Sequence, residues 1–492
     1  MPPDERPVLP AGALAIATPC GGVTHDSRRV EAGSVFVALR GLKADGADYV
    51  PQAISRGAAA IVADRPASTS TAVPWIEVKD ARLALAWLAA EFYAHPSGEM
   101  RVVGITGTNG KTTTGYLVSS IFEAAGTRCG LMGTVTYRIG TQEFAATRTT
   151  PEAPELQMMM RQMVTAGCGA CVMEVSSHAL ALRRADSIRF AGAVFTNLTR
   201  DHLDFHVSME EYFAAKRRLF EMLPDDAPAV INADDPRGAA MADATRLPVT
   251  YSINHAADVT SGPLSFSFEG LEFDARTPRG NVHVRSRLMG RPNAYNILAA
   301  VAVTAALEVP LDAIARGLER LQGVPGRFER VSSSADDITV VVDYAHTDDA
   351  LKNLLEMARP LASRRLITVF GAGGDRDRTK RPLMGMVAAR LSDVVVITSD
   401  NPRSEDPARI IDEVNLGAQP ETRQRGVEVV TIIDRRDAIA HAVAHAQAGD
   451  VVLIAGKGHE KYQEVGGSTL PFDDVAVARE ALDARRLRSR VG

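Results

Sequence analysis

The sequence predicts an α/β protein with three domains and mostly parallel sheets. Short apolar runs alternate with longer helical stretches almost throughout the chain, which is typical of parallel strands covered by helices. The chain has 492 residues, and at roughly 100–200 residues per domain this length favours about three domains. Near residue 107 a glycine-rich turn follows an apolar run, which indicates a phosphate-binding loop.

The first block of the chain, residues 1–98, ends at the turn-prone segment Pro96–Gly98. Within this block, Ser34–Leu39 and Ala58–Ala63 are expected as short strands around a helix near Gln52–Arg56. We therefore predict that residues 1–98 form the first domain.

The remaining residues divide into two further blocks, 99–329 and 330–492. The second block opens with the predicted strand Arg101–Thr106. The third block is typical of a doubly wound sheet with helices between its strands. Its expected strands are Ile338–Val342, Leu366–Phe370, Val394–Thr398, Val429–Ile433 and Val451–Ala455.

The composition excludes several classes of protein. Hydrophobic residues make up 46% and charged residues 23% of the chain, as in an ordinary globular protein. The net charge of -5 is not the basic balance of a nucleic-acid-coating protein, so we expect no nucleic-acid partner. No uninterrupted run of about 18 apolar residues exists, so we expect no membrane insertion.

The cysteines and the first residues indicate a cytoplasmic protein. Four cysteines in so long a chain give no disulfide framework. Cys168 and Cys171 form a lone CxxC, which is either a zinc or redox pair or two small residues entering a buried strand; no second pair or nearby histidine supports the metal. Met1–Pro10 is polar and proline-rich, without the apolar core of an export signal.

The strongest local signal is the glycine-rich turn before a helix predicted from Lys111 to Ala125. Backbone N–H groups in such a turn, with the helix N-terminus behind them, bind phosphate oxygens. Lys111 would neutralise the β- and γ-phosphates, and the hydroxyl of Thr112 would reach Mg²⁺. The usual GxxxxGK[ST] pattern needs glycine where this chain has Ile105, so a chance glycine-rich turn is the alternative.

The segment TGTNGKTT at Thr106–Thr113 is more specific than a generic phosphate loop, and it resembles the Mur ligase family of ATP-dependent amide-forming enzymes. Further motifs of that family follow in order: Glu174–Leu180, Thr196–Asp204, Asn293–Asn296, Gly326–Glu329 and Asp343–His346. The resemblance implies a UDP-sugar-binding domain (1–98), a central P-loop ATPase domain (99–329) and a Rossmann-like amino-acid-binding domain (330–492). The active site would lie between the three domains.

Four motifs resemble the members of the family that add the third peptide residue of the peptidoglycan precursor. They are Asp26–Arg28, Gly373–Asp377, Asp400–Arg403 and Gly456–Glu460. The resemblance implies a ligase that adds meso-2,6-diaminopimelate to UDP-N-acetylmuramoyl-L-alanyl-D-glutamate. A carboxylate is a poor acyl donor, so ATP would first convert it to an acyl phosphate, which the amine then attacks.

The resemblance also implies the residues that bind ATP. They are Gly107, Thr108, Asn109, Gly110, Lys111, Thr112, Thr113, Asn293, Arg327, Asp343 and His346. By itself, Arg327 could equally be a hinge arginine in a surface ion pair, and Asn293 or Asn296 could cap its helix. The family pattern DYAHTPDAL has a proline where this chain has Asp348, which leaves the local loop geometry open.

The implied catalytic residues are Lys111, Glu174, His202 and Lys216, and the implied Mg²⁺ ligands are Thr112, Glu174, His202 and Lys216. Glu174 ends an apolar strand, where the ligand crevice of open α/β sheets lies, and carboxylates suit Mg²⁺. A lone histidine such as His202 is more often structural. Lys216 lies on a predicted amphipathic helix, for which a solvated basic face is the alternative; the matching lysine of the family is carbamylated by CO₂.

The residues implied for the UDP-muramoyl dipeptide are Ser27, Lys43, Ala44, Thr149, Thr150, Ser176 and Arg184. Without the resemblance, these would be ordinary turn residues and helix caps. The family often has glutamine where this chain has Leu182, so one polar contact is either absent or replaced by Arg183.

The residues implied for diaminopimelate are Arg376, Asp400, Asn401, Pro402, Arg403, Gly456 and Glu460. At its far end this substrate carries a carboxylate and an ammonium, whereas lysine carries only an ammonium. The planar fork of Arg403 can hold a carboxylate bidentately, and Glu460 would accept from the ammonium. With lysine bound, a buried Arg403 would stay unpaired at a cost of several kcal/mol. The alternative is that Asp400–Arg403 is only an ordinary Asn-Pro turn after a strand.

Three other functions remain open from the sequence. One is a ligase for lysine or another amine, which Arg403 argues against. Another is a folylpolyglutamate synthetase-like ligase, although such relatives lack a UDP-binding first domain. The third is a P-loop switch without ligase chemistry. We expect a monomer whose domains close during the reaction.

Overall fold

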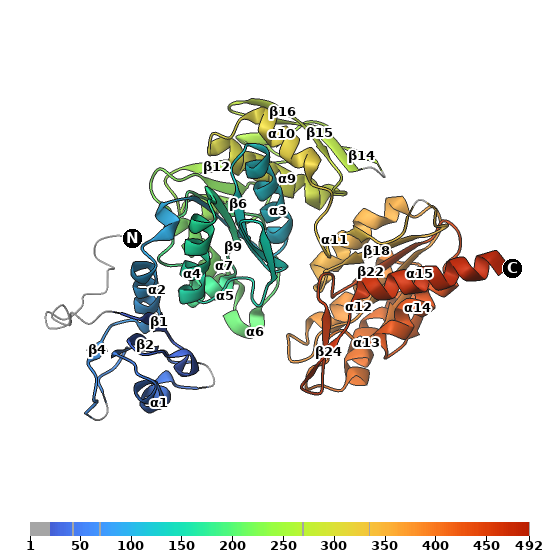
Figure 1. Cartoon of the computed structure of the whole chain (residues 1–492). Helices are drawn as coiled ribbons and strands as arrows, with labels where there is room; N and C mark the ends of the chain where they lie inside the picture. Colours follow the sequence, from blue (N-terminus) through green and yellow to red (C-terminus); the bar gives the residue numbers. More distant parts are fainter. Residues whose placement is uncertain (1–19, 42–43, 68–69, 268–269, 334, 492) are drawn as a thin grey trace.

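The computed structural model describes residues 20–41, 44–67, 70–267, 270–333 and 335–491. Figure 1 shows three α/β parts that follow one another along the chain, with the first and last parts on either side of the central one. Every helix in the described ranges is too short or too polar to cross a membrane.

The first part is a parallel sheet of four strands in the order β1-β2-β3-β4. Its strands are β1 (Gly22–Thr24), β2 (Ser34–Ala38), β3 (Ala60–Ala63) and β4 (Trp75–Glu77), and its helices are α1 (Val50–Ser55) and α2 (Ala81–Phe92). The two strands and the helix predicted here are confirmed to within two residues. A 3-10 turn occupies Pro96–Gly98, the break expected between the first two parts.

The central part is built on a sheet whose strand order is β14-β15-β13-β12-β11-β10-β5-β9-β6-β7-β8, with β16 paired to β15. The strands are β5 (Arg101–Thr106), β6 (Cys129–Met132), β7 (Thr136–Ile139), β8 (Gln142–Ala145), β9 (Ala170–Glu174), β10 (Gly192–Phe195), β11 (Ala229–Asn232), β12 (Pro248–Ser252), β13 (Val259–Ser261), β14 (Ser265–Ser267), β15 (Gly270–Thr277) and β16 (Gly280–Ser286). Strand β5 lies between β9 and β10, parallel to both. The phosphate loop therefore begins at the middle of the sheet.

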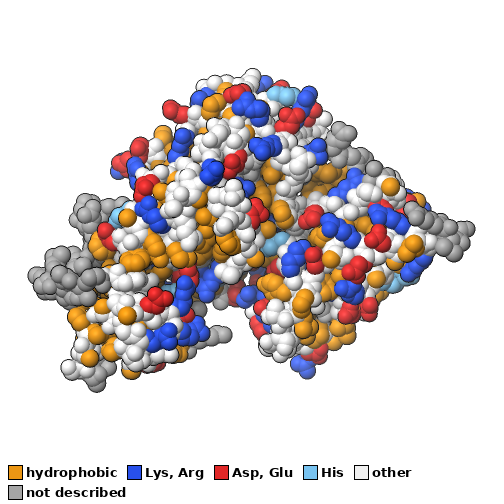
Figure 2. All heavy atoms as spheres, viewed as in Figure 1, with side chains coloured by type: hydrophobic (Ala, Val, Ile, Leu, Met, Phe, Trp, Pro, Cys, Tyr) orange, Lys and Arg blue, Asp and Glu red, His pale blue; other side chains and the backbone are white. Residues whose placement is uncertain are grey.

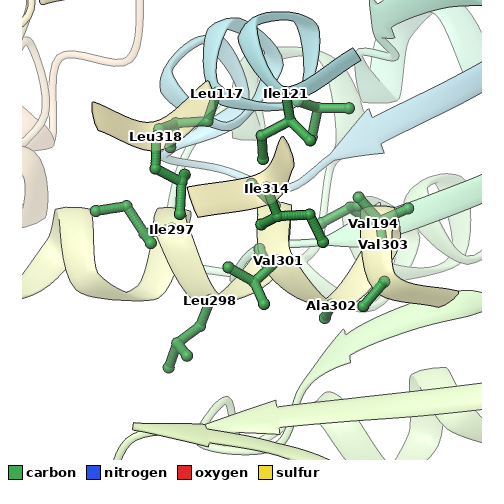
Figure 3. Close-up of a cluster of buried hydrophobic side chains, with 14 of the residues drawn as sticks. Leu117, Ile121, Val194, Ile297, Leu298, Val301, Ala302, Val303, Ile314 and Leu318 are labelled. Carbon is green, nitrogen blue, oxygen red and sulfur yellow. The ribbon is translucent and has the colours of Figure 1, made fainter. Parts of the chain in front are cut away.

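Helices cover both faces of this central sheet. They are α3 (Lys111–Ala124), α4 (Ala153–Thr165), α5 (Ser177–Ala181), α6 (Leu203–His206), α7 (Met209–Glu221), α8 (Gly238–Ala242), α9 (Arg291–Ala306) and α10 (Leu311–Arg320). Figure 3 shows α9 packed between the sheet and the helices α3 and α10 through Ile297, Val301 and Ile314. Helix α9 is apolar nearly all round because it is buried on all sides. This core fixes the first turn of α9 beside the phosphate loop.

The last part is a sheet in the order β17-β18-β22-β19-β20-β21, parallel except for β17. Its elements are β17 (Glu329–Arg330), β18 (Thr339–Asp343), β19 (Leu366–Phe370), β20 (Val394–Ile397), β21 (Glu428–Thr431), β22 (Val451–Ala455), α11 (Asp348–Ala358), α12 (Lys380–Leu391), α13 (Pro407–Arg425), α14 (Arg435–His445), α15 (Asp474–Val491) and the hairpin β23 (Tyr462–Val465) and β24 (Ser468–Pro471). The predicted doubly wound sheet is confirmed, and its loops after β19, β20 and β22 emerge side by side.

Candidate active site

The phosphate loop connects β5 to α3 and is folded around its own lysine. Lys111 Nζ donates to the carbonyl oxygens of Gly107 at 2.9 Å and Thr108 at 2.8 Å. Gly110 has φ +87°, and a Cβ there would lie 2.3 Å from Asn296 Oδ1 on α9. Gly107 has φ +148°, and its Cβ would lie 1.9 Å from Thr196 Oγ1. Both glycines are therefore required by the close approach of neighbouring segments.

The segment after β10 holds the loop in shape. Thr196 Oγ1 donates to Asn109 O at 2.6 Å, and Asn109 N donates to Asn197 Oδ1 at 2.9 Å. Thr108 Oγ1 accepts from Thr199 N at 3.0 Å. Asn109 Nδ2 donates to Asp349 Oδ2 on α11 at 3.1 Å, which links the loop to the C-terminal part.

Glu174 is buried at the end of β9, and both of its carboxylate oxygens face the phosphate loop region. Oε1 accepts from Thr112 Oγ1 and from Thr134 N, each at 2.9 Å, and Oε2 accepts from Thr134 Oγ1 at 3.0 Å. Glu174 and Thr112 thus place two hard oxygen donors side by side, a donor set that fits Mg²⁺.

Lys216 lies on the buried face of α7, with only 1% of its surface exposed. Its Nζ donates to Gly107 O at 2.8 Å and lies 4.4 Å from the centre of the Tyr212 ring. The alternative of a solvated basic face is therefore wrong for this residue. Burial, with Lys111 nearby, lowers the pKa of Lys216 well below the usual value for lysine.

His202 lies next to the same Tyr212. The two ring centres are 6.0 Å apart, and the ring of His178 is 4.9 Å from that of His202. The backbone of His202 has φ +55°, which is strained for a residue with a Cβ. Among the described residues, no three His, Cys, Asp or Glu side chains form a metal-binding group. A metal here would need other oxygen ligands as well.

The predicted nucleotide residues lie at the junction of the central and C-terminal parts. Arg327 Nη2 donates to Thr112 Oγ1 at 3.3 Å, and its guanidinium lies 4.6 Å from the centre of the Tyr344 ring. No ion pair involves Arg327 within the described part of the chain, so the alternative of a surface ion pair is not supported. Asp343 accepts from Phe328 N at 2.7 Å, and burial raises the pKa of its carboxyl.

Neither predicted asparagine caps α9. The capping position is Gly290, and Asn293 Nδ2 instead donates to Met289 O at 2.7 Å. Asn293 and Arg327 line one cavity of about 780 Å³. Another cavity, of about 870 Å³, borders Asn109 and Asn296.

His346 and Asp348 follow β18. His346 Nδ1 lies 2.9 Å from Tyr344 O, and the two rings are 4.6 Å apart, but His346 lines neither of the two cavities. Asp348 is the first residue of α11, which Thr347 caps. An acidic residue in the first turn favours a helix, so the departure from proline leaves α11 intact.

A cavity of about 1030 Å³ lies between the first and central parts. Ser27, Ala44 and Arg184 line it, together with Arg28, Arg29, Arg82 and Arg148. Ser27 Oγ donates to Gln52 Oε1 at 2.7 Å. Lys43 lies outside the described residues. Figure 2 shows basic side chains, with acidic ones among them, on the surface of the first part. The cavity is also lined by Asp26, Glu152 and Glu155, and each of them pairs with one or two of its arginines.

The other predicted dipeptide residues connect this cavity to Glu174. Thr150 Oγ1 donates to Glu174 O at 2.9 Å and accepts from Ser176 N at 3.1 Å. Thr149 Oγ1 lies 3.1 Å from Thr134 Oγ1. Arg184 Nη1 donates to Thr150 O at 3.1 Å.

Leu182 lines the cavity, while Arg183 does not. Arg183 is paired with Asp80 at 2.6 Å and with Asp186 at 2.7 Å. The alternative that Arg183 replaces the missing glutamine of the family is therefore not supported.

The predicted amine pocket is formed by three loops that follow β19, β20 and β22. A Cβ on Gly374 would lie 1.9 Å from Pro402 O, so the first two loops are in direct contact. Gly456 has φ +115°, and its Cβ would lie 2.5 Å from Asp400 Oδ2. Arg376 is exposed on the loop after β19, next to Gly373.

A buried lysine lies at the centre of this pocket. Lys457 is 0% exposed, and its Nζ donates to Glu460 Oε2 at 2.8 Å and to Asn401 Oδ1 at 2.9 Å. Asn401 Nδ2 donates to the same Glu460 oxygen at 2.9 Å. Burial raises the pKa of Glu460, an effect that Lys457 opposes. Both of these hydrogen bonds go to Oε2 of the carboxylate.

The amine pocket and the phosphate loop meet at the domain junction. A Cβ on Gly326 would lie 2.1 Å from His459 N, and the rings of Tyr344 and His459 are 4.9 Å apart. Tyr344 also lies under Arg327, which contacts Thr112. The residues predicted to bind the nucleotide therefore lie between the phosphate loop and the loop Gly456–Glu460.

Family models match most of the chain. The Mur ligase family catalytic domain matches residues 20–93, the Mur ligase middle domain residues 105–304, and the Mur ligase glutamate ligase domain residues 326–458. The chain belongs to the Mur ligase family. The predicted family and its three-domain architecture are thus confirmed.

Curated relatives of this Mur ligase are similar over nearly its full length. A UDP-N-acetylmuramoyl-L-alanyl-D-glutamate--2,6-diaminopimelate ligase of Gloeobacter violaceus is 50% identical, over 95% of this chain and 94% of the relative. The ligase of the same name from Geobacter metallireducens is 47% identical, over 98% of each chain.

Solved structures agree with the family. A UDP-N-acetylmuramoyl-L-alanyl-D-glutamate--2,6-diaminopimelate ligase matches with a TM-score of 0.68 and 35% identity, over 95% of this chain and 96% of that one. Folylpolyglutamate synthase of Mycobacterium tuberculosis, complexed with ADP, is 19% identical with a TM-score of 0.63, over 82% of this chain and 94% of that one, which shows the shared fold alone.

Sequence reasoning missed four residues that lie beside the predicted site residues. Thr134 holds Glu174, Tyr212 lies between Lys216 and His202, Lys457 holds Glu460, and Arg148 lines the cavity beside Arg184. Lys457 lies inside the Gly456–Glu460 motif, so the motif itself was the available signal. Tyr212 precedes Lys216 by one helical turn on α7, and Arg148 directly precedes Thr149, so both were within reach of local reasoning. Thr134 becomes a neighbour of Glu174 only through the packing of distant segments.

Proposed function

We propose that this Mur ligase uses ATP to add meso-2,6-diaminopimelate to UDP-N-acetylmuramoyl-L-alanyl-D-glutamate. The observation that carries the proposal is the amine pocket, where the carboxylate of Glu460 and the guanidinium of Arg403 belong to one set of interlocked loops. A substrate end with one ammonium and one carboxylate matches this pair of opposite charges. The names of the similar ligases support the same substrate.

In this proposal each part of the chain binds one reactant. Residues 1–98 contribute the wall of the UDP-sugar cavity, 99–329 the phosphate loop, and 330–492 the amine pocket. Arginines of the cavity between the first and central parts would meet the diphosphate of the nucleotide-sugar. Thr149, Thr150 and Ser176 would then bring the glutamyl end of the dipeptide next to Glu174.

ATP would be held at the junction of the central and C-terminal parts. The loop Gly107–Thr113 would bind the β- and γ-phosphates, with Lys111 turning from the loop carbonyls to the phosphate oxygens. Arg327 would add a second cation, because it already touches Thr112. We place the nucleoside in the cavities that border Asn293 and Asn296. Asp343 and His346 line neither cavity, but Asp343 accepts from the backbone N–H of Phe328, which lines one of them.

Thr112 and Glu174 would hold Mg²⁺ as oxygen donors, and His202 and Lys216 would hold a second ion if Lys216 is carbamylated. Mg²⁺ would neutralise charge on the transferring phosphoryl group. Burial lowers the pKa of Lys216, which favours the neutral amine over the ammonium. A neutral amine can attack CO₂ and, on releasing a proton, become a carbamate with oxygen donors. The amine thereby becomes an anion suited to a metal.

The chemistry joins two groups that do not react unaided. The glutamyl carboxylate attacks the γ-phosphorus, ADP leaves, and an acyl phosphate forms. The amine of diaminopimelate then attacks the acyl carbon, and phosphate leaves with the former carboxylate oxygen. Lys111 and Arg327 stabilise the crowded oxygens, and the pocket around Glu460 aims the amine. ATP and UDP-linked substrates support a cytoplasmic location, which we propose together with a monomeric state.

One assay tests this function. ATP-dependent phosphate release is measured with and without each organic substrate, with diaminopimelate and L-lysine supplied in parallel. We expect release only when the nucleotide-sugar dipeptide and diaminopimelate are both present. Release without them would indicate a nucleotide switch, and preference for L-lysine would indicate the other ligase.

A further inference from the structure

Arg403, the residue expected to bind the far carboxylate of the amine substrate, already has a carboxylate partner in this chain. Arg403 Nε lies 2.7 Å from Glu464 Oε2, and Nη1 donates to Gly374 O at 2.7 Å. The side chains are 25% and 36% exposed, so both are reachable from the pocket. Because of this pairing, Arg403 has a counter-charge in the chain itself, even when the bound amine has no far carboxylate.

Backbone bonds hold Glu464 at this place, independently of its charge. Arg403 N donates to Glu464 O at 2.9 Å, and Gly466 N donates to Arg403 O at 2.8 Å. Glu464 N donates to Asn401 Oδ1 at 3.0 Å, and Gln463 Nε2 donates to Asp400 O at 2.7 Å. Strand β23 is therefore bonded to the loop that contains Asp400–Arg403, and the Glu464 side chain projects from a fixed position.

The guanidinium has limited capacity for a second carboxylate. A bidentate pair uses two N–H groups along one edge of the fork. Glu464 Oε2 lies 2.7 Å from Nε as an ion pair, and Nη1 donates to the carbonyl of Gly374. The nearby Asp375 is bound to Ser404 through Oγ at 2.7 Å and N at 3.2 Å, which leaves Glu464 as the carboxylate on Arg403. A substrate carboxylate can form the full fork along the Nε edge only after Glu464 withdraws.

We propose that Glu464 is a specificity-determining residue of this chain, because its carboxylate competes with the far carboxylate of diaminopimelate for Arg403. This inference rests on the proposed function of the amine pocket. When diaminopimelate binds, Glu464 is displaced and rehydrated, which weakens binding. When lysine binds, the Arg403–Glu464 pair stays intact, so Arg403 keeps a counter-charge. Glu464 therefore lowers the ratio of kcat/KM for diaminopimelate to kcat/KM for lysine.

The test compares the parent with Glu464→Gln, which keeps the shape and the backbone bonds but removes the charge. Partly exposed ion pairs are worth up to about 1 kcal/mol, which corresponds to a change of up to about fivefold. We expect the KM for meso-diaminopimelate to fall about threefold, and the ratio of kcat/KM for meso-diaminopimelate to that for L-lysine to rise about threefold or more. Glu464→Ala, which lacks even a neutral acceptor, should move both values in the same direction.

A matched control is Glu480→Gln, which removes another Arg–Glu pair, with Arg436, between α14 and α15. It should leave both values at those of the parent. If the KM for diaminopimelate stays the same or rises in Glu464→Gln, or the ratio does not increase, Glu464 supports Arg403 rather than competing with the substrate, and the inference is wrong. A parent enzyme that does not ligate diaminopimelate at all would instead overturn the proposed function.

Discussion

Replacing Lys457 by methionine tests how the amine pocket is held together. The buried Nζ of Lys457 donates to Glu460 Oε2 and Asn401 Oδ1 at 2.8 and 2.9 Å, and lies 3.8 Å from Asp400 Oδ1. Methionine has a similar length and volume, so the change removes the charge without a large cavity. The variant leaves Glu460 next to another buried carboxylate with no cation between them.

The size of the effect follows from these contacts. Two buried hydrogen bonds donated by the charged ammonium are lost, each worth about 1.5–3 kcal/mol. Breaking a buried ion pair by removing one partner costs about 3–5 kcal/mol. We therefore expect the free energy of unfolding of Lys457→Met to be about 3–5 kcal/mol lower than that of the parent at about pH 8.

The loss of unfolding free energy in Lys457→Met should be larger at high pH than at low pH. Burial already raises the pKa of Glu460, and the pKa rises further without Lys457. Between the ordinary pKa of glutamate and this raised pKa, the folded state binds more protons than the unfolded state, so stability falls as pH rises. The loss should therefore be smaller at about pH 5.5 than at about pH 8, by up to about 1.4 kcal/mol per pH unit.

Lowering the pH should reduce the loss of stability in Lys457→Met but weaken its binding of diaminopimelate. The ammonium of diaminopimelate needs an ionised Glu460, so the KM of the variant should rise as the pH falls, more steeply than in the parent. Urea unfolding and steady-state kinetics at both pH values measure the two effects. The control is Lys461→Met, which removes an exposed lysine paired with Asp473 at 2.8 Å and should show neither effect. Equal losses of stability at both pH values, with a parent-like KM profile, would refute the assigned role of Lys457.

Three further substitutions test other parts of the site. Lys216→Ala should lose most ligase activity at every bicarbonate concentration, whereas Arg217→Ala, on the exposed side of α7, should not; full activity of Lys216→Ala would contradict the carbamate. Arg403→Ala should raise the KM for diaminopimelate about tenfold or more while the KM for ATP is unchanged, and equal turnover by mutant and parent would contradict the assignment. Gly110→Ala places a Cβ 2.3 Å from Asn296 Oδ1 at φ +87°, so it should weaken ATP binding and cost about 1–2 kcal/mol of stability; a parent-like melting temperature and KM for ATP would show that the loop tolerates a side chain there.

Several elements could be predicted because their signals are local. Strand Val451–Ala455 is a continuous apolar run and Leu366–Phe370 is apolar except for Thr368, and the structure has both at the predicted bounds. Helix α3 begins at Lys111 directly after the glycine-rich turn, as expected. Strands β13–β16 were not predicted, because they are short or polar on one face and are stabilised mainly by pairing with one another.

The sequence by itself determined the family and the glycine-rich turn that leads into α3, because these depend on short motifs whose spacing is read directly; the residues of each binding region stay predictions. Only the tertiary structure decided that Lys216 is buried under Gly107, 109 positions away, and that Arg327 reaches Thr112 across 215 positions. It alone placed Glu464 on Arg403. Contacts of this kind depend on how sheets and helices pack, which no local pattern of residues specifies.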